Sequence, residues 1–369
     1  MQNMNLTEPQ AVYKSNFYKT AAERRTEQTE VITMKKFEGY MHGINLGGWL
    51  SQCEKYSEKH YSSFIKEDDI KAIADWGLDH VRLPIDYTII EDEDGNILEA
   101  GYSHIDDCIE WCQKNGLNLV LDLHKTKGFS FDNNPDDNVM FEDTDLRNRF
   151  ISLWKTLALR YGNIDIVAFE LLNEIAKIDA PLWNSLATET IKELRKIAPN
   201  KKIIIGGTQW NSVHTLSNLN IPLDENIVYN FHFYEPFLFT HQSAYWLPAI
   251  SNISMNYPGH MEEYRACSKR IQCFGSGLYN TNEIGEEFME ALIIEAVDAA
   301  DKAGVPIYCG EYGVIDTADI DDTLKWYQDI HNVFEKYGIG RAAWTYKKMD
   351  FGLIDEHYSS RRNEIIHCL

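Results

Sequence analysis

The feature that most constrains the fold of this chain is the alternation, from residue 40 onward, of short apolar runs with longer amphipathic stretches. The short runs are rich in Val, Ile and Phe, and the longer ones carry apolar residues at helical spacing. Such alternation is typical of βα units, whose strands form a parallel sheet. Eight runs are predicted to be strands: MHGINLG (41–47), HVRLP (80–84), NLVLDLH (118–124), DIVAFELLN (165–173), KIIIGG (202–207), IVYNFHFY (227–234), VPIYCGEYG (305–313) and GRAAWTY (340–346).

The number of repeats favours one architecture. Eight βα units predict an α/β fold of the (β/α)8 TIM-barrel type, which commonly uses about 250 residues or more. A doubly wound sheet is the weaker alternative, because no GxGxxG motif follows the first strand and no P-loop is found. Helices are predicted over 103–115 with Ser103 as N-cap, over 144–161, from Pro181 onward, and over 286–303 before Gly304.

One interval between a predicted strand and the helix that follows it is longer than the others. Residues 236–285, between the sixth strand and its helix, are rich in aromatic residues, Asn, Ser and Gly. Because the interval follows the C-terminal end of a strand, we expect a small helical subdomain inserted near the active-site face of the barrel. Residues 1–36 are predicted to be an N-terminal extension, either an arm or disordered. Residues 37–369 are predicted to form a single (β/α)8 domain.

The charge balance narrows the class of ligand. The chain has 57 acidic and 35 basic residues, for a formal net charge of −22. Nucleic acid and anionic membrane surfaces are therefore not expected as partners, because both require a basic footprint. Nine Trp and 20 Tyr favour instead a neutral, hydroxyl-rich ligand that stacks on aromatic rings.

Targeting signals and cysteines point to an intracellular protein. No apolar run approaches the roughly 18–20 residues that span a bilayer. The polar N-terminus lacks a secretory signal, so we expect a cytoplasmic location, or secretion if a signal once preceded it. Seven scattered cysteines favour reduced thiols. Cys267 and Cys273 are near enough in sequence to form a disulfide bond, and the cysteines do not have the spacing of a zinc site.

Polar residues gather at the C-terminal ends of the predicted strands, where barrel active sites lie. Any one of them has an ordinary structural explanation, and the inference depends on their falling at one level of six strands. Glu174 and Glu311, on the fourth and seventh strands, supply the two carboxyl groups that glycoside hydrolysis requires. The full set is Arg82, His124, Asn173, Glu174, His232, Tyr234, Glu311 and Trp344.

The neighbours of the two glutamates fit that chemistry. Asn173 is an amide suited to holding the 2-hydroxyl of a sugar whose anomeric carbon becomes cationic. Arg82 is expected to keep Glu311 ionised, and Tyr234 is expected to donate a hydrogen bond to its carboxylate.

The chain resembles glycoside hydrolase family 5 of the retaining TIM-barrel clan from about residue 40 to 355. The resemblance implies that Glu174 is the acid/base and Glu311 the nucleophile. It also implies a supporting shell of Arg82, His124, Asn173, His232, Tyr234 and Trp344, and a sugar-stacking role for Trp246. Asn45 is a further candidate for the supporting or substrate-binding set. The motifs that carry it are HGINLGGW (42–49), DHVRLP (79–84), FELLNE (169–174), YNFHFYEPFLFTHQ (229–242), YCGEYGV (308–314) and AWTYKKMDFG (343–352).

The expected reaction is a retaining double displacement, with the two carboxyl groups roughly 5–5.5 Å apart rather than the roughly 6.5–9.5 Å of an inverting pair. No metal or cofactor is expected, because proton transfer and a covalent ester carry the reaction. Trp344 is expected beneath the sugar that is cleaved, with Trp246 and Trp210 at flanking subsites. Lys125 stands where members of the family often carry a second His, which leaves the linkage and sugar preference open.

These features predict an endo-β-1,4-glucanase acting on soluble cellulose, mixed-linkage glucan or cellodextrins. A β-mannanase or a β-1,3-glucanase on the same barrel is the alternative. A non-catalytic carbohydrate-binding barrel is an alternative of another class, and such a protein would be expected to have lost Glu174 or Glu311. The sequence leaves endo or exo action and the oligomeric state open.

Overall fold

A computed structural model describes residues 34–132, 138–220, 222–271 and 281–369. They belong to one compact unit, residues 33–369. The predicted extension, apart from residues 34–36, lies outside the described part. Met34 and Phe37 are both buried in clusters of the barrel core.

Eight parallel strands close into a barrel, which confirms the predicted fold. The order around the barrel is β1-β10-β9-β6-β5-β4-β3-β2, so that strands adjacent in the βα repeat are hydrogen-bonded neighbours. The strands are β1 (His42–Asn45), β2 (His80–Asp86), β3 (Asn118–Lys125), β4 (Val167–Glu170), β5 (Ile203–Gly206), β6 (Ile227–Phe233), β9 (Ile307–Tyr312) and β10 (Gly340–Ala343).

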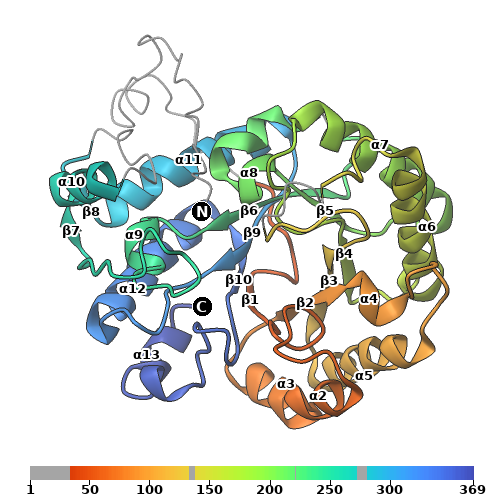
Figure 1. Ribbon diagram of the computed structural model, residues 1–369, viewed down its shortest axis with the longest axis horizontal. Helices are drawn as coiled ribbons and strands as arrows, with labels where there is room; N and C mark the ends of the chain where they lie inside the picture. The colour runs from red at the N-terminus through yellow and green to blue at the C-terminus, as the bar shows by residue number, and fades with distance from the viewer. Residues whose placement is uncertain (1–33, 133–137, 221, 272–280) are drawn as a thin grey trace, which may run out of the picture. The chain divides into compact units, whose positions relative to one another are not determined.

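Helices surround the strands (Figure 1). The larger ones are α3 (Glu67–Asp75), α5 (Glu99–Asn115), α6 (Thr144–Tyr161), α7 (Ala180–Ile197), α11 (Glu286–Ala303) and α12 (Ile320–Tyr337). Shorter elements are α2 (Glu58–Phe64), α4 (Tyr87–Ile90), α8 (Thr208–Asn211), η2 (Val213–Asn218), η3 (Glu356–Tyr358) and α13 (Arg362–Ile366).

The predicted helix boundaries hold except at α5. Pro181 lies in the first turn of α7, and α11 ends before Gly304, whose φ of +69° requires a left-handed conformation. Ser103 is not an N-cap, because α5 begins at Glu99 and Leu98 occupies the cap position. Inside the helix, the Ser103 hydroxyl donates instead to the carbonyl of Glu99, four residues earlier.

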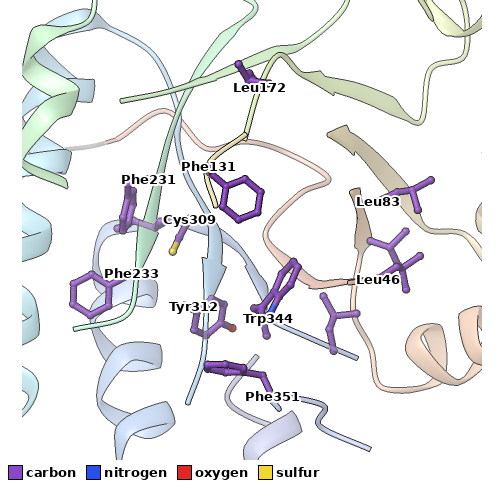
Figure 2. Packing of buried hydrophobic residues seen from close by; sticks show 14 of the residues in the cluster. Leu46, Leu83, Phe131, Leu172, Phe231, Phe233, Cys309, Tyr312, Trp344 and Phe351 are labelled. Carbon is purple, nitrogen blue, oxygen red and sulfur yellow. The ribbon is translucent and has the colours of Figure 1, made fainter. Parts of the chain in front are cut away.

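The inward side chains of the strands form layers, because successive residues of a strand point to opposite faces. One apolar layer consists of Val120, Ala168, Ile204, Val228, Tyr308 and Ala342. Phe37 and Tyr40, which precede β1, pack against this layer. The larger apolar cluster, part of which is drawn in Figure 2, includes Trp344 and Phe351.

The interval 236–285 contains a short helix α9 (Phe237–Thr240), a helix α10 (Met261–Ile271) and an antiparallel pair of strands. The helices agree with the predicted insertion, whereas the pair β7 (Gly259–His260) and β8 (Glu283–Ile284) was not predicted. Cys267 is a buried free thiol on α10, and Cys273 lies outside the described residues. Within the described part of the chain, no helix has both the length and the apolar composition to cross a membrane.

Candidate active site

The predicted polar residues come together at one end of the barrel. Arg82 alone differs from its predicted position at the end of a strand. Glu174 follows β4, Glu311 is the fifth residue of β9, and Trp344 follows β10. Arg82 does not stand at the end of its strand, because β2 continues to Asp86. Its long side chain instead rises from the barrel interior and is fully buried.

Arg82 connects two glutamates at the centre of the barrel. Its Nε donates to Oε2 of Glu170 at 2.7 Å, and its Nη2 donates to Oε1 of Glu170 at 2.9 Å. Its Nη1 donates to Oε1 of Glu311 at 2.8 Å, which is the contact expected from the sequence. Burial would lower the pKa of Arg82, but the surrounding carboxylates raise it above its ordinary value, so the cation is retained.

Two amides and a third carboxylate complete the surroundings of Arg82. Oδ1 of Asn45 accepts from Nη1 at 2.9 Å, and Oδ1 of Asn173 accepts from Nη2 at 2.7 Å. Oδ2 of Asp122 lies 3.0 Å from Nη2. Asn45 is fully buried and its amide also donates to the carbonyl of Gly310, so it supports Arg82 rather than facing solvent. Nδ2 of Asn173 has no hydrogen-bond partner in the structure, which leaves a donor for a sugar hydroxyl.

Glu311 is held by two donors, one on each oxygen. Arg82 bonds Oε1, and the hydroxyl of Tyr234 donates to Oε2 at 2.9 Å, again as expected. Burial raises the pKa of Glu311, while Arg82, His124 and the Tyr234 hydrogen bond lower it, and the net direction is upward. The two donors favour the ionised form that a nucleophile requires.

Glu174 stands opposite Glu311 in a different environment. Its φ of +39° lies in the left-handed region, which non-glycine residues rarely adopt. Its Oε1 lies 3.0 Å from Nδ1 of His232, and the side chain is 15% exposed. Burial and the nearby charge of Glu311 raise the pKa of Glu174 well above its ordinary value. A carboxyl group whose pKa is raised favours its protonated form, which is the form that general acid catalysis requires.

The same groups form the one cluster of three potential metal ligands found among the described residues. Atoms of Glu174, His232 and Glu311 all lie within 4.8 Å of one another. Arg82 and Tyr234 already donate to both oxygens of Glu311, and His232 bonds Glu174. This hydrogen-bonded arrangement fits an acid and a nucleophile. The expectation that no metal is needed stays a prediction.

His124 and Trp344 form a second part of the site. Their rings stack at a centroid distance of 5.9 Å with an interplanar angle of 5°. Nδ1 of His124 lies 2.6 Å from Oδ2 of Asp122, and Nε2 lies 3.1 Å from the amide nitrogen of Gln52. Burial is the main cause that lowers the pKa of His124 to about 4, so the ring is neutral at neutral pH. A Cβ on Gly47 would approach the Trp344 ring to 2.8 Å, so the indole requires a glycine here.

Three other residues singled out from the sequence are more exposed than the central residues of the site. Trp210, after β5, is 37% exposed, and Trp246, in the insertion, is 41% exposed. Exposed rings are available for sugar stacking, and their assignment to flanking subsites stays a prediction. Lys125 forms an ion pair with Asp132, and its ammonium lies 5.2 Å from the ring centre of Phe131.

Several residues of the site were absent from the predicted set. Asp122 and Glu170 are fully buried, and Asn230 donates from Nδ2 to Oε1 of Glu170 at 2.8 Å while accepting from the backbone nitrogen of Gly310. The alternation of inward and outward residues along a strand could have predicted these buried polar residues. Asp122 lies two residues after the inward Val120, and a charged residue at an inward position of an apolar strand indicates a buried partner.

Comparisons with known proteins identify the family to which this chain belongs. The model of the cellulase family, glycosyl hydrolase family 5, matches residues 40–350. Cellodextrinase A of Ruminococcus flavefaciens is 44% identical over 317 residues, which cover 85% of this chain and 88% of that protein. Endoglucanase C of Acetivibrio thermocellus is 41% identical over 333 residues, which cover 89% of this chain and 97% of that protein.

Solved structures give the same result for the fold. Cel5A of Thermotoga maritima has been solved with cellobiose and with mannotriose. It is 25% identical to this chain, with a TM-score of 0.70 and coverage of 89% of this chain and 97% of that chain. With a barrel that carries two facing glutamates and a family match over most of its length, this chain belongs to the cellulase family, glycosyl hydrolase family 5.

Proposed function

We propose that the protein is a retaining endo-β-1,4-glucanase that hydrolyses β-glucan chains such as soluble cellulose, mixed-linkage glucan and cellodextrins. The observation that carries the mechanism is the approach of the Glu174 and Glu311 carboxylates, whose ligand oxygens lie within 4.8 Å of each other. The carboxyl groups of retaining pairs are roughly 5–5.5 Å apart, whereas those of inverting pairs lie roughly 6.5–9.5 Å apart to admit a water molecule. The 4.8 Å limit refers to single oxygens, one from each group, and is compatible with the retaining range. The close approach of these oxygens supports direct attack by one carboxylate.

In the first step, an oxygen of ionised Glu311 attacks the anomeric carbon and the bond to the leaving oxygen breaks. Protonated Glu174 transfers its proton to that oxygen, which leaves as a hydroxyl group. The raised pKa of Glu174 favours the protonated form that this step requires. Asn173, whose Nδ2 has no protein partner, can donate to the 2-hydroxyl as positive charge develops on the sugar.

In the second step, Glu174 acts as a base. It removes a proton from water, the water oxygen bonds to the anomeric carbon, and the ester bond to Glu311 breaks. Esterification removes the negative charge of Glu311, which is one cause of the raised pKa of Glu174. The pKa of Glu174 therefore falls in the intermediate, which converts the acid of the first step into the base of the second.

The substrate class is supported by the named relatives, a cellodextrinase and an endoglucanase, each more than 40% identical to this chain. A β-mannanase is the second candidate, because a structural neighbour was solved with mannotriose as well as cellobiose. Lys125 bears on this choice, because it lies next to His124 and places a cation at the end of β3.

A mechanism-based trap tests the chemistry. Incubation with a 2-fluoro cellobioside that carries a good leaving group should add one glycosyl mass to the peptide that contains Glu311. The Glu311→Gln variant should take up no label, whereas Glu283→Gln, at an exposed glutamate of β8, should label like the wild type. A label on another residue would overturn the assignment of the nucleophile.

A substrate panel tests the specificity. Carboxymethyl cellulose, barley β-glucan, cellodextrins, mannan and laminarin should be compared at equal mass, with the products sized. We expect internal cleavage of the first two and of long cellodextrins. Activity on mannan or laminarin alone would contradict the proposed substrate and favour the β-mannanase or the β-1,3-glucanase.

A further inference from the structure

The residue Asn211 has a buried amide that faces the side of His232 turned away from Glu174. It ends α8, which follows β5, and it is fully buried. Its φ of +53° lies in the left-handed region, which Asn tolerates better than most residues. Nδ2 of Asn211 lies 3.2 Å from Nε2 of His232, while Oδ1 has no hydrogen-bond partner in the structure.

The surroundings of His232 determine which ring nitrogen carries the proton. Nδ1 faces two carboxylate oxygens, Oε1 of Glu174 at 3.0 Å and Oε2 of Glu311 at 3.7 Å. The proposed mechanism keeps Glu311 ionised, and its negative charge beside Nδ1 favours the ring proton on Nδ1 rather than on Nε2. Burial and the charge of Arg82 lower the pKa of His232 well below its ordinary value, so the ring holds one proton only. Nε2 is then an acceptor and needs a donor.

The amide of Asn211 supplies that donor and is held in place by β5. A Cβ on Gly206, the last residue of β5, would lie 2.2 Å from Oδ1, 2.5 Å from Cγ and 2.7 Å from Nδ2 of Asn211. The backbone of Gly206 therefore packs directly against the amide. Any side chain at this position would displace the amide from His232.

We propose that Asn211 is a positioning residue that fixes His232 in the tautomer protonated on Nδ1. The Nδ1–H group then always donates to Oε1 of Glu174, so Oε1 remains an acceptor. When Glu174 is protonated, its proton resides on Oε2, the oxygen left to face the leaving group. This inference rests on the proposed acid/base role of Glu174. It adds a residue that sets which oxygen of the acid carries the transferable proton.

Nitrogen-15 spectra of histidine-labelled protein test the tautomer directly, because protonated and bare ring nitrogens have well-separated shifts. The His232 signals are assigned by their loss in His232→Gln. In the wild type we expect a protonated Nδ1 and a bare Nε2. In Asn211→Asp, which keeps the side-chain shape but has no N–H to donate, Nε2 should gain a proton. A protonated Nε2 in the wild type would overturn the proposal.

Leaving-group dependence tests the consequence for catalysis. With a cellobioside whose phenol leaves poorly, Asn211→Asp should lose at least about tenfold in kcat/KM, because protonation by Glu174 limits the rate. With 2,4-dinitrophenyl cellobioside, which needs no protonation to depart, kcat/KM should remain within about threefold of the wild type. Gly206→Ala should give the same contrast by displacing the amide. An equal loss on both substrates would indicate a structural role and overturn the proposal.

A matched control is Asn184→Asp, at a buried asparagine of α7 that donates to the carbonyl of Asn218. It should leave the ratio of the two kcat/KM values unchanged. A failure of the proposed function is distinguishable from a failure of this inference. The former would show as an inactive wild type without a 2-fluoro label, whereas the tautomer of His232 would still be readable in the nitrogen-15 spectrum.

Discussion

Arg82 and Glu170 form a bidentate ion pair inside the barrel, with N–O distances of 2.7 Å and 2.9 Å and no exposure of either side chain. The two parallel hydrogen bonds to Glu170 fix the plane of the Arg82 guanidinium group. An N–H of Nη1 is thereby directed at Glu311. The position of Glu311, the proposed nucleophile, thus depends on a carboxylate to which the proposed mechanism gives no chemical step.

Replacement of Arg82 by Lys should be strongly destabilising. A lysine keeps the charge but cannot form the fork, so Glu170 or Asp122 would lose its partner in a buried site. We expect the free energy of unfolding to fall by about 3–5 kcal/mol, measured by urea denaturation. Arg361→Lys, in an exposed ion pair with Asp321, is the control and should leave the midpoint unchanged. A wild-type midpoint in the Arg82 variant would contradict the structural role.

Loss of the acid/base should be rescued by a small anion. Glu174→Ala should reduce kcat on cellodextrins by about 10²–10⁴-fold. With 2,4-dinitrophenyl cellobioside, the first step needs no acid and the glycosyl-enzyme should accumulate. Azide should then restore turnover and yield a β-glycosyl azide, because it attacks the intermediate without a base. The product is identified by NMR, and an α-azide would contradict the double displacement.

Removal of the Tyr234 hydroxyl should move the acidic limb of the pH profile. Its hydrogen bond to Glu311 lowers the pKa of that carboxyl, so Tyr234→Phe should raise it. Because Glu311 must be ionised to attack, the acidic limb of kcat/KM should shift to higher pH. Tyr337→Phe is the matched control, since that hydroxyl donates to Glu290 on the outer helices. A shift to lower pH, or the same shift in both variants, would exclude this role for Tyr234.

The raised pKa of Glu174 also predicts a dependence of stability on pH. A carboxyl whose folded pKa lies above its ordinary 4.5 binds more protons in the folded state, so it makes the protein less stable as pH rises above that value. In Glu174→Gln this group no longer titrates. The variant should therefore gain stability over the wild type between about pH 4 and about pH 8, measured by denaturation at both values. A constant difference across this range would contradict the raised pKa.

The exposed indole of Trp246 should contribute to binding of long substrates only. Trp246→Ala should raise KM for cellotetraose and longer chains by about tenfold, equivalent to about 1.4 kcal/mol, through loss of aromatic contact. The kcat/KM on a short aryl cellobioside should stay unchanged. Leu159→Ala, at an exposed leucine of α6, should affect neither substrate. An equal effect on short and long substrates would remove Trp246 from the flanking subsites.

The repeated strands and the two glutamates could be predicted because their signals are local. Apolar runs define the strands, and residues at their C-terminal ends meet at one face of any parallel barrel. The predicted start of α5 was wrong because a serine such as Ser103 fits a cap and a helix interior equally well. In the structure the cap position is occupied by Leu98, and the helix begins at Glu99. The sheet of β7 and β8 has strands of two residues each, too short to leave a pattern.

The sequence by itself determined the barrel, the pair Glu174 and Glu311, and most of the polar residues around them. The reason is that the periodicity of the strands and the residues at their ends can be read directly from the sequence. The contacts of Glu311 with Arg82 and Tyr234 were also expected, whereas only the tertiary structure decided the remaining partners. The contact of Arg82 with Glu170, and that of His232 with Asn211, join residues far apart in the chain. Burial raises the pKa of Glu170 and lowers that of His232, and no local sequence pattern encodes this burial or these contacts.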